Sequence, residues 1–248
     1  MTTESPGPTA LRSDKAWRAG DPSPATADDH ADREMRKYGT PTEYIAGRVE
    51  IDGRAFLVDR RVYIPNRESR ILLDAALPCL KPGATVLDVG TGCGWLAILI
   101  KLAVPTARVL ATDIEAGALE VARTNASVHG ARVEFFRSSL CRGVDLDTPP
   151  DIVIADLPYG EERHALSHEA GPAHDHLPVT STFPKGGPLS VYGDLLDAVA
   201  ERGWQCRVFC EIGLVEDHVV AADLGGWGFG VQIQRREGHG VAVFTPDP

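Results

Sequence analysis

Residues 154–160 of this chain read IADLPYG, an apolar run that ends in a carboxylate, a proline and a tyrosine. A second carboxylate, Asp88, lies in VLDVGTGCGW at residues 86–95, just before three closely spaced glycines. A third, Asp113, ends the stretch RVLATD. Carboxylates accept hydrogen bonds from hydroxyl and amino groups, and glycines let a ligand approach main-chain N–H groups. These residue types predict a site for a polar ligand.

The three carboxylates follow stretches with the composition of buried strands. From Ser69 onward such strands alternate with helical patterns, which is typical of a doubly wound parallel α/β sheet. The stretches, in order, are TVLDVG, WLAILIKLAV, RVLATD, AGALEVARTNASVHG, RVEFFRS, DIVIAD, YGDLLDAVAERG and RVFCEIG. A final GVQIQRREGHGVAVF predicts an antiparallel hairpin on the sheet edge. Since the carboxyl ends of parallel strands share one edge, we expect the acids to lie together.

The chain divides by composition into three parts. Residues 1–30 are rich in Pro, Ser, Thr, Ala and Asp and bury too little apolar surface to offset ordering entropy, so we expect a flexible tail. Residues 31–68 predict a short helix stopped by Gly39 and two strands around an Asp52-Gly53 turn, as a small element on the substrate side. Residues 69–248 form the expected α/β domain.

Composition limits the possible partners. The chain has 248 residues and a formal net charge of −10, which opposes binding to a polyanion and suits a small or cationic ligand. Five cysteines without a Cys-x-x-Cys pair indicate reduced thiols and predict a cytoplasmic location. The most apolar stretch is shorter than the roughly 20 residues that cross a bilayer, so no membrane association is expected.

The glycine spacing separates two kinds of nucleotide site. A dinucleotide-binding loop has Gly-x-Gly-x-x-Gly, whereas the third glycine here comes one residue earlier. The pattern resembles motif I of class I methyltransferases, which bind S-adenosylmethionine (SAM); a purely structural turn is the alternative. The resemblance implies that the cofactor is SAM and that it is bound by Asp88, Gly90, Thr91, Gly92, Gly94, Asp113, Ile114, Ser139, Leu140 and Asp156. Many relatives carry an acid at the position of Ser139.

Residues 41–246 resemble the HemK/PrmC methyltransferases, which methylate the side-chain amide of glutamine in peptide release factors. PTEYIAGRVEIDGRAFLVDRRVYIPNRES resembles their entry segment, and FCEIG resembles a late strand. The resemblance implies a Rossmann-like fold with a seven-stranded, mostly parallel sheet. Two features depart from it: a short leader replaces a helical N-terminal domain, and Asp-Leu-Pro-Tyr replaces Asn-Pro-Pro-Tyr.

The same resemblance assigns roles to the acceptor tetrapeptide. Asp156 and the Leu157 carbonyl would orient the acceptor nitrogen, Pro158 would stiffen the turn and Tyr159 would pack on the substrate plane. Further substrate contacts are expected from Asn66, Arg67, Glu68, Glu161 and Glu162.

The aspartate in this tetrapeptide suggests a particular acceptor. Asparagine offers one donor and one acceptor, which match a carboxamide, whereas an ionised aspartate offers only acceptors. Ionised Asp156 would therefore favour a guanidinium, and L-arginine or a similar small cationic compound is the expected substrate, methylated on its δ nitrogen. The alternatives are a release-factor glutamine, an RNA guanine amino group and a SAM-binding module without activity.

A histidine-rich stretch follows the tetrapeptide, with His164, His168, His174 and His176. Its spacing is compatible with metal ligands. Methyl transfer needs no metal, so we expect a substrate-covering loop and no metal site.

Overall fold

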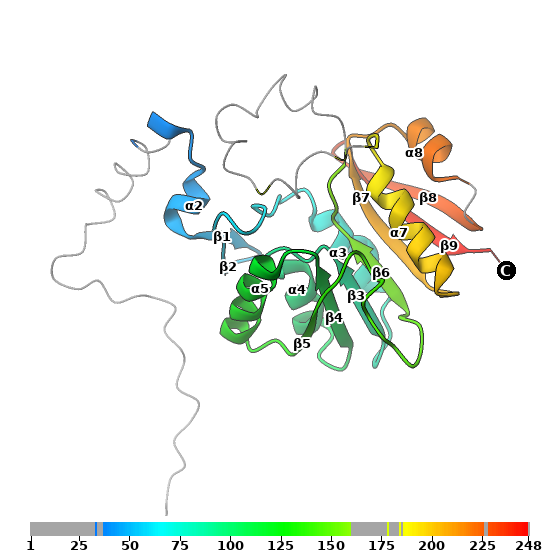
Figure 1. Cartoon of the computed structure of the whole chain (residues 1–248), viewed down its shortest axis with the longest axis horizontal. Coiled ribbons are helices and arrows are strands. Elements are labelled where there is room, and N and C mark those ends of the chain that lie inside the picture. Colours follow the sequence, from blue (N-terminus) through cyan, green and yellow to red (C-terminus); the bar gives the residue numbers. More distant parts are fainter. Residues whose placement is uncertain are drawn as a thin grey trace, which may run out of the picture.

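The computed structural model describes residues 33, 37–159, 178, 184, 186–225 and 228–247. Its centre is a seven-stranded sheet in the order β5-β4-β3-β6-β7-β9-β8 (Figure 1). The first five strands in this order are parallel, and β9 is antiparallel to both β7 and β8. The bounds are β3 (Thr85–Val89), β4 (Arg108–Asp113), β5 (Val133–Arg137), β6 (Ile152–Ala155), β7 (Arg207–Gly213), β8 (Phe229–Arg236) and β9 (His239–Pro246). The predicted seven-stranded, mostly parallel sheet with a C-terminal antiparallel hairpin is confirmed.

Helices cover both faces of this sheet, because parallel neighbours must be joined by crossover connections. One face carries α3 (Arg70–Ala76), α4 (Trp95–Ala103) and α5 (Ala116–His129), and the other carries α7 (Ser190–Glu201) and α8 (Asp217–Leu224) (Figure 1). Two hydrophobic clusters, one on each face, form the core. All four residues of β6 are buried, as expected for a strand covered on both sides.

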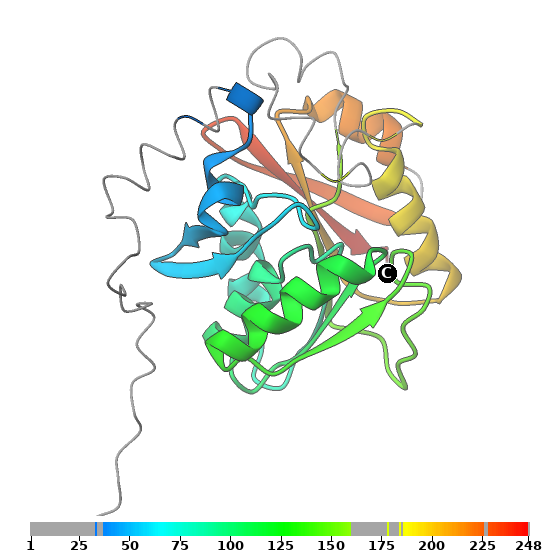
Figure 2. The same cartoon turned by 60° about the vertical axis from the view of Figure 1, so that its left-hand side comes forward.

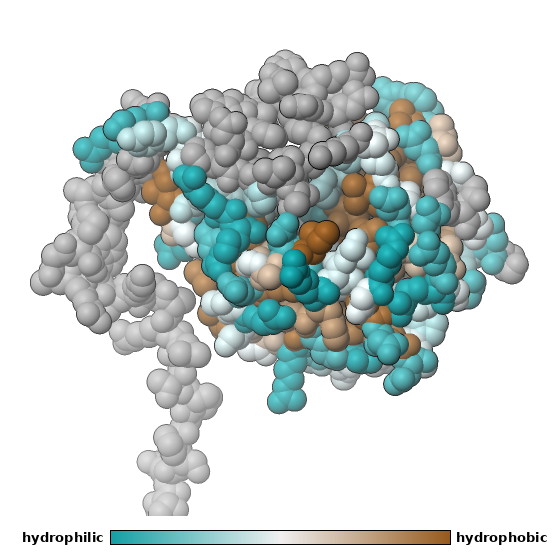
Figure 3. Space-filling view, in the orientation of Figure 1, coloured by the Kyte–Doolittle hydropathy of each residue, from teal (hydrophilic) through white to brown (hydrophobic). Residues whose placement is uncertain are grey.

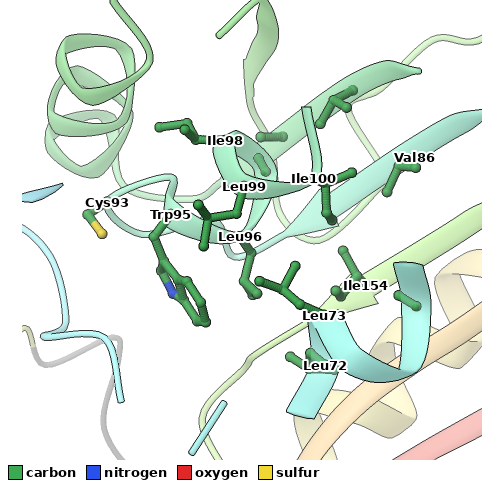
Figure 4. Close-up of a cluster of buried hydrophobic side chains, with 14 of the residues drawn as sticks. Leu72, Leu73, Val86, Cys93, Trp95, Leu96, Ile98, Leu99, Ile100 and Ile154 are labelled. Carbon is green, nitrogen blue, oxygen red and sulfur yellow. The ribbon is translucent and has the colours of Figure 1, made fainter. Parts of the chain in front are cut away.

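The α4 helix shows how the sequence builds this core. Six consecutive residues from Trp95 to Ile100 are buried, because α4 packs on β3, β4 and β5 and against α5. In the cluster shown in Figure 4, Leu96 lies beside Leu73, and Ile100 lies on the side of Val86 and Ile154. The α3 helix ends at Ala76, and a 3-10 turn over Leu77–Cys79, which contains Pro78, follows it.

The expected N-terminal hairpin is present. It consists of β1 (Arg48–Ile51) and β2 (Arg54–Leu57), with positive φ at both Asp52 and Gly53, as the tight turn requires. A short helix, α2 (Thr42–Ala46), precedes it and was not predicted. The hairpin lies beside α5 (Figure 2). The expected tail over 1–30 and most of the expected helix over 31–39 fall outside the described residues.

A buried asparagine fixes this hairpin to the α/β domain. Asn125 in α5 accepts a hydrogen bond from the Leu57 N–H at 2.7 Å and donates to the Leu57 carbonyl at 3.0 Å. The same amide group donates to the Cys93 carbonyl at 2.9 Å. Asn125 therefore joins the hairpin to the loop that carries the three glycines.

Charged and polar groups dominate the face seen in Figure 3, with apolar residues in separate patches. Within the described ranges, no helix is long and apolar enough to cross a membrane.

Candidate active site

Asp88 is the most buried acid of the predicted cofactor site. It lies in β3, fully buried, and its Oδ2 accepts a hydrogen bond from the Thr91 hydroxyl at 2.6 Å. Burial raises the pKa of Asp88 to about 7, while the Thr91 hydroxyl lowers it. Its other oxygen, Oδ1, has no hydrogen-bond partner among the described residues. An orphaned buried acceptor calls for a donor, which suits a ligand with amino or hydroxyl groups.

The glycine loop after β3 is shaped by two kinds of contact. The N–H groups of Gly90 and Thr91 donate to the Thr112 carbonyl at 2.9 and 2.8 Å, which holds the loop against the end of β4. Gly90 has φ +74, and a Cβ there would lie 2.4 Å from Cδ2 of Leu157. Gly90 therefore makes room for the acceptor tetrapeptide, a reason that the sequence pattern did not suggest.

Asp113 ends β4 at the same edge of the sheet. Its carboxylate accepts hydrogen bonds from the N–H groups of Gly92 and Glu115, both at 2.9 Å, and burial raises its pKa. The next residue, Ile114, is 51% exposed despite being apolar. An exposed apolar side chain next to a half-buried acid is the arrangement expected around a ribose and its base.

The predicted adenine position follows β5. Ser139 is exposed and Leu140 is half-buried. Leu140 has φ +55, a left-handed conformation that costs a leucine about 1–2 kcal/mol. Such strained residues concentrate at ligand sites. Asp88, the glycine loop, Ile114 and Leu140 therefore fit a nucleoside with a polar tail, as SAM is.

The acceptor tetrapeptide begins directly after β6. Because Ala155 pairs with both Val89 of β3 and Cys210 of β7, Asp156 emerges between the glycine loop and the end of β7. Asp156 is partly exposed, and the neighbouring Ser69 hydroxyl donates a hydrogen bond to it. The predicted acceptor position is thus one strand away from the predicted cofactor loop.

Tyr192 of α7 braces this turn, and the sequence analysis missed it. Its buried hydroxyl accepts a hydrogen bond from the Leu157 N–H at 3.0 Å. It also lies 3.1 Å from the Leu157 carbonyl and contacts the Glu211 carbonyl of β7 more closely. One hydroxyl proton serves one carbonyl at a time, so donation to Glu211 leaves the Leu157 carbonyl available to a substrate N–H.

Tyr159 lies across the end of β7. A Cβ on Gly213 would come within 2.4 Å of the Tyr159 hydroxyl and ring, so only glycine permits this placement. Burial, followed by the negative charges of Glu211 and Asp156, raises the pKa of Tyr159. The ring therefore stays a neutral, planar surface beside Asp156.

Residues 63–69, which precede α3, differ in how close they lie to the acceptor tetrapeptide. Asn66, Arg67 and Glu68 are exposed. Glu68 acts on Glu211, whose pKa it raises, so it lies on the site side of the segment. Burial of the Tyr63 hydroxyl, then the charges of Asp156 and Glu211, raises the pKa of Tyr63, which also places this tyrosine near the tetrapeptide. Ser69 and Tyr63 were not predicted as site residues.

Several expected contributors lie outside the described residues: Glu161, Glu162 and the histidines from His164 to His176. Among the described residues, no group of three or more metal-ligating side chains is found. An open cavity of about 730 Å³ lies elsewhere, at the beginnings of β4 and β5, where Lys101, Arg108, Arg123 and Glu134 line it. This cavity is at the opposite sheet edge from the carboxylates.

Comparisons with known proteins agree with this arrangement. Residues 66–170 match the family model described as "Methyltransferase small domain". The release factor glutamine methyltransferase of Neisseria gonorrhoeae is 41% identical over 233 residues, covering 87% of this chain and 80% of that protein. That of Enterococcus faecalis is 34% identical, covering 63% of this chain and 56% of that protein.

Solved structures share the fold at low sequence identity. A ribosomal protein L11 methylase from Lactobacillus delbrueckii subsp. bulgaricus superposes with a TM-score of 0.52 at 21% identity, covering 74% of this chain and 81% of that chain. A 16S rRNA methyltransferase of T. thermophilus, solved with AdoMet and guanosine, has a TM-score of 0.56 at 16% identity, covering 80% of this chain and 49% of that chain. Because the sequence identity of 41% extends over most of both chains, the chain belongs to the release factor glutamine methyltransferase (HemK/PrmC) family of SAM-dependent N-methyltransferases.

Proposed function

We propose that this enzyme transfers the methyl group of SAM to the side-chain amide nitrogen of a glutamine in a protein acceptor, with a release factor as the first candidate. The main support is the 41% identity to a protein named for that reaction, over most of both chains. The placement of Asp156 one strand from the glycine loop supports it independently, because methyl transfer requires the two groups to be adjacent.

The expected preference for arginine gains no support. It depended on Asp156 being ionised and facing a cation, but the carboxyl of Glu211 lies beside Asp156. Burial raises the pKa of Asp156 above its ordinary value, so a protonated carboxyl, which has a donor as well as an acceptor, is accessible. A protonated carboxyl at this position would match a carboxamide, and the relatives' names favour glutamine over a small cationic substrate.

Each residue of the tetrapeptide then has a task in positioning. SAM supplies an electrophilic methyl group on a sulfonium. Asp156 and the Leu157 carbonyl orient the acceptor nitrogen by its N–H groups, and Pro158 limits the turn's freedom. Tyr159 presents its ring to the plane of the acceptor amide. The main catalytic contribution is orientation, because an in-line displacement needs the nitrogen about 3 Å from the methyl carbon.

Methylation assays on separate acceptors test this proposal. The purified chain would receive methyl-labelled SAM with four acceptors in parallel: a bacterial release factor, the same protein with its acceptor glutamine replaced by alanine, free L-arginine, and an RNA containing unpaired guanine. Label on the first acceptor alone supports the proposal. Label on arginine or RNA would replace it with another acceptor class, and SAM binding without any transfer would indicate a binding module.

A further inference from the structure

Glu211 is a buried acid at the site whose carboxyl oxygens have no hydrogen-bond partner among the described residues. It lies in β7, one residue beyond Cys210, and Cys210 is the register partner of Ala155 in β6. Asp156 is likewise one residue beyond Ala155, so Asp156 and Glu211 occupy matching positions on neighbouring parallel strands, which lie about 4.8 Å apart. Tyr192 ties the two backbones together through its contacts with Leu157 and the Glu211 carbonyl. The backbones that carry the two carboxyl groups are therefore held side by side.

Burial makes this neighbourhood costly for two negative charges. Glu211 is 1% exposed, and neither carboxyl oxygen has a hydrogen-bond partner among the described residues. The Tyr159 hydroxyl and the Gly213 N–H act on this carboxyl in the direction that lowers its pKa, but neither meets hydrogen-bond geometry. Two adjacent carboxyls, with Glu211 buried, Asp156 half-buried and no hydrogen-bonded cation among the described residues, cannot both ionise easily, so a proton is retained.

The described elements around the pair supply mainly acids and hydroxyls, and β9 supplies one histidine. Glu68 and Tyr63 face it from the segment before α3, and Asp88 faces it from β3. His239 of β9 is the nearest basic group, with its Nδ1 3.9 Å from Oε1 of Glu211. The remaining polar neighbours are the hydroxyls of Ser69, Tyr159 and Tyr192. Burial raises the pKa of both Asp156 and Glu211, and the charge of Asp156 raises that of Glu211 further.

We propose that Asp156 and Glu211 share one proton in the active enzyme, so that the pair presents one donor and one acceptor to the glutamine carboxamide, and that Glu211 is thereby a further positioning residue. This inference rests on the proposed function. The protonated carboxyl donates to the amide carbonyl oxygen, and the ionised carboxyl accepts an amide N–H. The pair thus replaces the single asparagine of the resembling tetrapeptide.

The shared proton also leaves a base for the reaction. When the amide nitrogen forms its bond to the methyl carbon, the sulfur–carbon bond breaks and its electron pair stays on sulfur, which becomes a neutral thioether. The nitrogen then releases one proton, and the ionised carboxylate of the pair accepts it. The pair becomes neutral and returns that proton to solvent before the next turnover, so no further reactant is required.

The pH dependence of kcat/KM for a release-factor acceptor tests this inference. In the unaltered enzyme, kcat/KM should fall about tenfold per pH unit on the alkaline side, where the pair loses its last proton. Asp156→Asn has a permanent donor and acceptor, so this alkaline decline should disappear while transfer to glutamine continues. Glu211→Gln removes the neighbouring charge, so Asp156 ionises more readily and the decline should move to lower pH. Glu201→Gln, which changes an exposed glutamate on α7, should leave the profile unaltered.

The outcomes separate this inference from the proposed function. No transfer to glutamine by the unaltered enzyme at any pH would refute the proposed function itself. Transfer to glutamine with the same alkaline decline in all three variants would refute only the shared proton. An infrared difference spectrum between acidic and alkaline pH adds a reading that needs no acceptor: a protonated-carboxyl band of the pair should be present near neutral pH and should shift or weaken in both Asp156→Asn and Glu211→Gln, over the band of Asp88 that all three proteins share. A spectrum without that band in the unaltered enzyme would overturn the inference even if a variant failed to fold.

Discussion

Replacing Gly213 by alanine should displace the Tyr159 ring and thereby disturb the acceptor site, although every side chain of the tetrapeptide is kept. The added Cβ would lie 2.4 Å from the Tyr159 hydroxyl oxygen and Cε2, and 2.6 Å from Cζ. Ordinary van der Waals contact begins at 3.4 Å, so the rigid ring must move by about 1 Å. A misplacement of about 1 Å costs on the order of 100-fold in rate, or about 2.7 kcal/mol of transition-state stabilisation.

A matched control separates this displacement from backbone strain. Gly213 has φ +49, and alanine in the left-handed region costs about 1–2 kcal/mol wherever it is placed. Gly203, which follows α7, has φ +64, and a Cβ there would meet no atom within 4 Å. Gly203→Ala should therefore lose similar stability in thermal unfolding but keep its kcat/KM. Equal losses of kcat/KM in both variants, or an unchanged kcat/KM in Gly213→Ala, would refute the proposed role of the Tyr159 ring.

Three further changes have defined expectations. Asn125→Ala leaves the backbone groups of Leu57 unpaired and should cost about 2–4 kcal/mol of unfolding free energy, with faster hydrogen exchange at the Leu57 amide; unchanged protection would contradict this. Tyr192→Phe orphans the buried Leu157 N–H and should cost about 1–3 kcal/mol in denaturant titration and lower kcat more than it raises KM; a loss in stability alone would make Tyr192 purely structural. Burial raises the pKa of Glu211 to about 8, so the folded state favours the protonated carboxyl. The contribution of Glu211 to the free energy of unfolding is therefore complete below the ordinary glutamate pKa. Between that pKa and the folded-state value it declines by about 1.4 kcal/mol for each unit that the pH rises. Glu211→Gln should flatten this decline in unfolding measured across pH, and parallel curves would disprove the burial argument.

Much of the fold follows from local sequence patterns. Buried strands such as β6 read as short apolar runs, and the glycine loop after β3 identifies the switch from strand to helix. These patterns also place Asp88, Asp113 and Asp156 at one edge, because parallel strands share their direction. The short helices α2 and α8 escaped prediction because five or eight residues show little periodicity.

The residues that complete the site could not be found in this way. Tyr192 contacts Leu157 across 35 positions of sequence, and Asn125 contacts Leu57 across 68. Glu211 lies inside the apolar strand FCEIG, and the sequence showed only that this strand resembles a late strand of the family. The charge state of Asp156 could not be fixed from the sequence for the same reason: a pKa depends on burial and neighbours, and a residue's type does not reveal either.

Tandem mass spectrometry of the methylated acceptor tests the central claim most directly. The account predicts a single added methyl on the side-chain nitrogen of one glutamine of the release factor, and its absence when Asp156 is replaced by alanine. Methyl groups on arginine, or an unchanged yield on glutamine from the Asp156→Ala enzyme, would contradict it.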